Sequence, residues 1–157
     1  MGSQPRRVCV TLESRLESMD LGEEIARCVA GTAAFDEDEQ HRISMAVREC
    51  VINAFKHGNC SDVRKKIEVD FTLLADRLVV AVRDEGKGFS LNQLPDPLAD
   101  ERLLATSGRG IFLMRCFMDD LRVVSGPDGG TVVTMTKHLP SNHKPTAAAE
   151  ATKERQP

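Results

Sequence analysis

A pair of adjacent strand patterns constrains the fold of this chain more than any other feature. In residues 66–74 an apolar side chain occupies every second position, as expected of a strand with one buried face. Residues 77–84 form a second, more apolar run, and only Ala75 and Asp76 separate the two runs. Two strand patterns joined by so short a turn predict a β-hairpin, and therefore antiparallel pairing.

Similar patterns predict the remaining elements. They are strands at residues 7–12, 121–125 and 131–138, and helices at residues 16–34, 36–57 and 108–118. Asp36-x-x-Glu39 is a capping box for the second helix, and Gly58 is expected to end it in the left-handed conformation. The order of elements favours an α+β fold, a two-layer α/β sandwich with helices on one face of a mixed, mostly antiparallel sheet.

The composition argues against several classes of protein. The net charge of −3 and the aromatic content of 4% do not suit a nucleic-acid binder. The five cysteines show no C-x-x-C spacing, so neither a zinc site nor a disulfide framework is expected. No run approaches the roughly 18 apolar residues of a membrane span. We expect a cytoplasmic protein with one folded domain at residues 7–139, a flexible N-terminus at 1–6 and a disordered tail at 140–157.

The predicted second helix carries two stripes of side chains. At about 100° per residue, an apolar stripe faces the core, formed by Ile43, Val47, Cys50, Val51 and Ala54. Glu49, Asn53 and His57 are spaced i, i+4, i+8 and form a polar stripe along its boundary. A carboxamide such as that of Asn53 can hold Mg²⁺ beside phosphate oxygens, and Glu49 can accept a proton from an attacking hydroxyl. The alternative is a solvated helix face.

The end of the second hairpin strand is unusual because an acid follows an apolar face. Asp84 has the same parity as Leu78, Val80 and Val82, and an acid in that position is costly unless it is paired or functional. Gly86 and Gly88 allow a ligand or a backbone to approach closely. A carboxylate there can accept a hydrogen bond from the adenine amine, which favours ATP over GTP. The alternative is an ordinary Asp-Glu-Gly turn.

A third polar cluster, Ser107-Gly108-Arg109-Gly110, opens the predicted helix at 108–118. Free amides at a helix N-terminus attract phosphate, and Arg109 can add charge-assisted contacts. The segment 86–107 has no periodicity, and we expect it to be a lid over the nucleotide. The alternative is a capped loop-to-helix turn without a ligand.

The three clusters together resemble a known family. E-x-x-x-N-A-x-x-H-G-N, D-x-G-x-G-F and G-x-G-I-x-L-M are similar to the N, G1 and G2 boxes of the GHKL ATPase superfamily, and within it to the anti-sigma-factor serine/threonine kinases of bacterial partner switches. The resemblance covers residues 7–139 and implies a Bergerat-type fold that binds Mg-ATP. It implies that Glu49 is the general base, that Asn53 is the magnesium ligand and that Asp84 binds adenine. The other expected ATP-site residues are His57, Gly86, Gly88, Phe89, Ser107, Gly108, Arg109, Gly110, Ile111 and Thr131.

The resemblance also implies partners. Such proteins form homodimers, bind a sigma factor and phosphorylate a small STAS-type antagonist, the anti-anti-sigma protein. Thr106 stands where several members carry an arginine, so Arg102 or Arg109 would have to replace it, and Asp119-Asp120 replaces an Asp-Glu pair. The alternative function is a nucleotide-binding module of a partner switch without kinase activity, or one with a client other than a sigma factor.

Overall fold

The computed structural model describes residues 4–88 and 108–141 of the chain. The predicted site residues Phe89 and Ser107, most of the expected lid and nearly all of the expected tail lie outside these described residues.

The elements follow the predicted order. They are β1 (Arg6–Glu13), α1 (Glu17–Thr32), α2 (Glu37–Asn53), a π-helical turn (Ala54–Gly58), β2 (Lys66–Leu73), β3 (Arg77–Asp84), α3 (Gly108–Phe117), β4 (Asp120–Ser125) and β5 (Thr131–His138). The β2–β3 hairpin is confirmed, with Leu73 paired to Leu78 next to the turn. In the part of the chain that the structure describes, no helix is long and apolar enough to cross a membrane.

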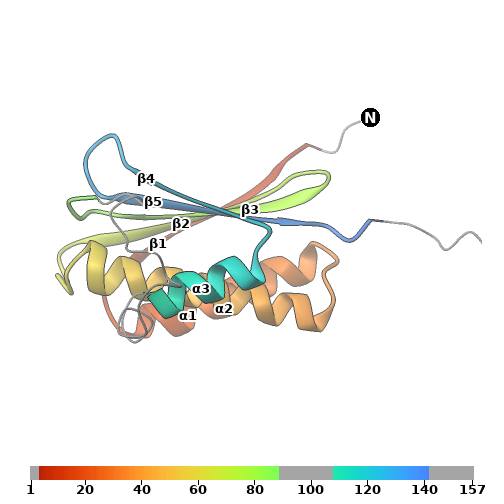
Figure 1. Ribbon diagram of the computed structural model, residues 1–157, viewed down its shortest axis with the longest axis horizontal. Coiled ribbons are helices and arrows are strands. Elements are labelled where there is room, and N and C mark those ends of the chain that lie inside the picture. The colour runs from red at the N-terminus through yellow and green to blue at the C-terminus, as the bar shows by residue number, and fades with distance from the viewer. Residues whose placement is uncertain (1–3, 89–107, 142–157) are drawn as a thin grey trace, which may run out of the picture.

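The strands form one five-stranded sheet in the order β1-β2-β3-β5-β4. The helices α1, α2 and α3 cover the same face of it, which confirms the α+β two-layer architecture (Figure 1). The predicted mixed sheet is wrong in one respect, because every pairing among the described strands is antiparallel. The reason is the placement of β5, which returns from the β4 edge and inserts between β4 and β3, antiparallel to both.

The core lies between the sheet and the helices. The inward-facing side chains of the hairpin are buried, including Ile67 and Val69 of β2 and Val80 and Val82 of β3. The apolar stripe of α2 is buried as well, with every predicted member at most 5% exposed. Burying each such aliphatic side chain contributes about 1.5–3 kcal/mol, so these two faces account for much of the driving force for folding.

The two ends of α2 differ in how well the sequence predicted them. The Asp36 side chain accepts a hydrogen bond from the Glu39 amide at 2.8 Å, as the capping box predicts. At the other end, the prediction for Gly58 is wrong, because its φ is not positive. The helix instead widens into the π-helical turn, and the Asn59 amide donates to the Ala54 carbonyl at 2.7 Å. The residues with positive φ follow this turn, at Cys60 and Ser61.

Candidate functional site

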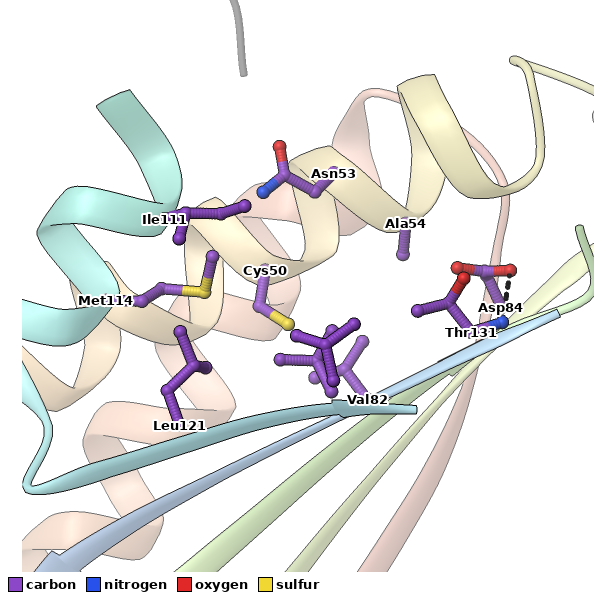
Figure 2. A pocket seen from close by; sticks show the side chains of 11 residues that line it. Cys50, Asn53, Ala54, Val82, Asp84, Ile111, Met114, Leu121 and Thr131 are labelled. Carbon is purple, nitrogen blue, oxygen red and sulfur yellow. Dashed lines mark hydrogen bonds between the residues drawn. The ribbon is translucent and has the colours of Figure 1, made fainter. Parts of the chain in front are cut away.

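A pocket lies between α2, α3 and the sheet, and it brings together Asn53 of the first polar cluster and Asp84 of the second (Figure 2). Its lining comes from α2 and the π-helical turn (Cys50, Asn53 and Ala54), β3 (Val82 and Asp84), α3 (Ile111 and Met114), β4 (Leu121 and Val123) and β5 (Thr131 and Val133). The cavity measures about 20 Å³, which is room for about one water molecule. Its walls are apolar, and Asp84, Thr131 and Asn53 supply the polar groups.

Asp84 is the buried acid of this pocket, with 6% of its surface exposed. One carboxylate oxygen, Oδ1, accepts hydrogen bonds from the Gly86 amide at 2.9 Å and the Thr131 amide at 3.0 Å. The other oxygen, Oδ2, accepts none from the described residues. Burial raises the pKa of Asp84 above its usual range, and the two amide hydrogen bonds oppose that rise. The protein therefore holds one oxygen in place and leaves the other available.

Two glycines are required by close packing around this carboxylate. A Cβ on Gly58 would overlap Oδ2 of Asp84, and a Cβ on Gly86 would overlap the Gly58 carbonyl oxygen. Gly86 was predicted as a place of close approach, whereas Gly58 was predicted only to end the helix. The π-helical turn explains the difference, because it carries Gly58 against Asp84 instead of away from it.

Thr131, the first residue of β5, lies beside Asp84 (Figure 2). Its side chain is 1% exposed, and its hydroxyl oxygen has no hydrogen-bond partner within the described ranges. An unsatisfied buried hydroxyl costs about 1–3 kcal/mol, so such an atom indicates a place for a water or a ligand. Together, Asp84 Oδ2 and Thr131 Oγ1 offer the pocket two hydrogen-bonding atoms that have no partner among the described residues.

Glu49 and Asn53 lie together on the side of α2 that faces α3. A Cβ on Gly110 would lie 2.9 Å from Oε2 of Glu49 and 3.4 Å from Nδ2 of Asn53. Both side chains are half-buried, and the structure gives neither an ion pair nor a hydrogen bond with another described residue. His57 does not share this position: the π-helical turn breaks the i, i+4, i+8 arithmetic, and His57 is exposed and outside the pocket lining.

The other predicted site residues differ in their relation to the pocket. Ile111 lines it and is 5% exposed, whereas Arg109 is exposed at the start of α3, which begins at Gly108. Gly88 adopts a φ of 81°, in the left-handed region that favours glycine. A Cβ there would come within 2.7 Å of the Gly130 carbonyl oxygen, so Gly88 fits closely against the turn before β5.

Apart from Ile111, the apolar wall of the pocket was not predicted as part of a site. Cys50 is 1% exposed, and burial raises the pKa of its thiol far above the ordinary value, so it serves as a neutral apolar wall. Its place in the buried stripe of α2 was a usable signal, since Asn53 and Ala54 lie one turn later. Leu121, Val123 and Val133 carried no such signal, because only the order of the strands in the sheet places β4 and β5 beside β3 at the pocket.

Known proteins resemble this chain in sequence and in fold. Residues 12–137 match the family model of the histidine kinase-like ATPase domain. The chain is 35% identical over 104 residues to the anti-sigma F factor of Oceanobacillus iheyensis, covering 65% of this chain and 71% of that protein. It is 33% identical over 119 residues to the serine-protein kinase RsbW of Bacillus subtilis, covering 71% and 72%.

The fold has a solved counterpart. The crystal structure of the RsbU and RsbW domains of a Mycobacterium tuberculosis protein matches with a TM-score of 0.62 at 21% identity, covering 86% of this chain and 33% of that one. The family name implies ATP binding, which agrees with a pocket in which Asp84 and Thr131 each have a polar atom without a partner among the described residues. The chain belongs to the histidine kinase-like ATPase domain family.

Proposed function

We propose that this protein is an ATP-dependent serine/threonine kinase and anti-sigma factor of a bacterial partner switch. It would bind a sigma factor, and it would phosphorylate a STAS-type antagonist. One observation carries the proposal: a single pocket is lined by Asp84, Thr131 and Asn53, and Glu49 lies with Asn53 beside Gly110 of α3. The names of the relatives, anti-sigma F factor and serine-protein kinase RsbW, support the choice of this activity among those of ATPases.

Adenine would be recognised by the part of the pocket that Asp84 and Thr131 line. Oδ2 of Asp84 would accept a hydrogen bond from the exocyclic amine, and the Thr131 hydroxyl would satisfy a second polar atom of the ligand. The cavity has room for about one water molecule, so the pocket would have to widen to admit a base. Gly86, Gly88 and Ile111 would bound the nucleotide, and Phe89 and His57 remain predictions at its margin.

The phosphates would extend toward the start of α3. The amides there, from Gly108 to Gly110, would attract the negative charge, with Arg109 and Ser107 beside them. Asn53 presents a neutral oxygen without a partner among the described residues, which fits Mg²⁺ as a ligand next to phosphate oxygens. When bound, Mg²⁺ would neutralise charge that develops on the phosphates.

Glu49 would serve the transfer itself. The hydroxyl oxygen of the acceptor forms a bond to the γ-phosphorus, the bond to the bridging oxygen breaks, and ADP leaves. The proton of that hydroxyl would pass to the Glu49 carboxylate, which has no competing ion pair with any described residue. The absence of a side chain at Gly110 keeps the space between α3 and Glu49 open.

The test has two stages. Calorimetry would compare ATP with GTP, with and without Mg²⁺, and we expect binding that depends on Mg²⁺ and prefers ATP. Transfer of labelled γ-phosphate to individual STAS-type proteins of the source organism would then be measured, in the presence and absence of its sigma factors. Light scattering would test for the expected homodimer. ATP binding without transfer to any acceptor would favour the nucleotide-binding module without kinase activity, and no ATP binding would refute the proposal.

A further inference from the structure

Asn59 is a buried polar residue outside the pocket lining, directly after the π-helical turn. Its side chain is 0% exposed, and its carboxamide is fully used. Nδ2 donates to the Lys66 carbonyl at 3.0 Å and lies 3.4 Å from the Ser14 hydroxyl, while Oδ1 accepts from the Glu85 amide at 2.8 Å. A buried amide with every bond satisfied fixes the segments that it connects, because breaking any of these bonds leaves a buried polar atom unpaired.

The carboxamide of Asn59 takes the place of a backbone peptide group between two strands. The β2–β3 ladder ends at the pair of Ile67 and Asp84, so the next backbone groups, on Lys66 and Glu85, do not pair with each other. Asn59 accepts from the Glu85 amide and donates to the Lys66 carbonyl, and the Lys66 amide donates to the Glu85 carboxylate at 3.0 Å. The ladder is thus continued through a side chain.

This bridge determines the surroundings of Asp84. The Glu85 amide donates to Asn59, and Glu85 is the residue that connects Asp84 to Gly86 in the chain. The Gly86 amide in turn donates to Asp84 Oδ1. Gly58, the residue before Asn59, packs against Asp84 Oδ2, and Gly86 packs against the Gly58 carbonyl. Asn59 therefore anchors both segments that enclose the carboxylate. It does so without lining the pocket and without a hydrogen bond to Asp84.

We propose that Asn59 is a positioning residue for base recognition: its carboxamide clamps Gly58 and Glu85 together and so fixes which Asp84 oxygen faces the pocket. The inference rests on the proposed function in that Asp84 recognises adenine. Without the clamp, the segments at Gly58 and Glu85 would move independently of each other. Both the affinity for ATP and the preference for ATP over GTP would then fall.

The experiment compares Asn59→Ala with Leu78→Ala, which removes a fully buried side chain at the opposite end of β3. Each variant is assayed by calorimetry with ATP and GTP well below its own melting temperature. We expect Asn59→Ala to lose ATP affinity at least tenfold and to lose part of its selectivity, whereas Leu78→Ala keeps both per folded molecule. Unchanged affinity in Asn59→Ala, or an equal loss in Leu78→Ala, would overturn the inference.

A second measurement works without nucleotide. Amide hydrogen exchange should show lost protection at Gly86 and Thr131, the two donors to Asp84, in Asn59→Ala but not in Leu78→Ala. Unchanged protection in Asn59→Ala would overturn the inference whether or not the wild-type protein binds ATP. Failure of the wild-type protein to bind ATP would separately refute the proposed function. Asn59→Ser, whose shorter hydroxyl cannot span both Glu85 and Lys66, gives the same test if the alanine variant does not fold.

Discussion

Replacing Asp84 with asparagine tests the base-recognition site most directly, because the structure dictates how asparagine must sit. Oδ1 of Asp84 accepts two backbone hydrogen bonds, from Gly86 and Thr131. An asparagine can preserve both only by placing its oxygen there, which puts its NH₂ group at the position of Oδ2. A donor then faces the adenine amine, itself a donor, whereas the carbonyl oxygen of guanine is an acceptor.

The magnitude follows from the one hydrogen bond that is lost. A hydrogen bond to a charged acceptor contributes about 1.5–3 kcal/mol. At 1.4 kcal/mol per factor of ten, ATP affinity should fall about 10- to 150-fold in Asp84→Asn. Because the introduced NH₂ group can donate to guanine, the preference for ATP over GTP should fall further than the ATP affinity alone.

The same substitution should make the free protein more stable at neutral pH. Burial raises the pKa of Asp84, so the native state binds a proton more readily than the unfolded chain does. The ionised carboxylate therefore costs stability as the pH rises through its native pKa, and asparagine carries no such cost. The gain in Tm should shrink well below about pH 3.9, where aspartic acid is neutral in both states.

Calorimetry with ATP and GTP and thermal unfolding between acidic and neutral pH measure the two effects. An unchanged ATP affinity would refute the assignment of Asp84 to adenine. A lower Tm at neutral pH would show instead that the ionised carboxylate gains more from the amides of Gly86 and Thr131 than it loses by burial.

Three further changes test other parts of the site. Gly58→Ala should lower the free energy of unfolding by roughly 1–3 kcal/mol and reduce ATP affinity, because the added methyl overlaps Asp84. The control is Gly31→Ala, whose Cβ would lie 3.6 Å from Gln40 and which should stabilise α1 by about 0.5–1 kcal/mol. Denaturant titration measures both variants, and equal changes in the free energy of unfolding would contradict the packing argument at Gly58. Glu49→Gln should preserve ATP affinity and slow phosphoryl transfer by about 10² or more, with the exposed Glu24→Gln as control; full activity would remove Glu49 from catalysis. Iodoacetamide should modify only the four exposed cysteines of the native protein, and mass spectrometry should find Cys50 modified only after unfolding.

The local pattern of the sequence was sufficient to predict the order of the elements and the buried faces of α2, β2 and β3. The strand bounds of β3 and β5 were predicted as they occur, because alternation with period two depends only on neighbouring residues. The inward direction of Asp84 follows from the same parity, and the N-terminus of α2 from a capping interaction three residues long. The placement of Asn53 and Glu49 near a boundary of the core follows from helical periodicity over a single helix.

Only the tertiary structure decided how these pieces form a site. Thr131 donates to Asp84 across 47 residues, and Glu85 donates to Asn59 across 26, so no local pattern encodes either contact. The π-helical turn, which moves His57 to the surface and Gly58 onto Asp84, departs from the 3.6-residue period on which the helical prediction relied. The sequence determined which side chains were available, through their local periodicity. The order of the strands and the packing of α3 determined which of them meet, because those contacts depend on the free energy of the whole core and not on any one segment.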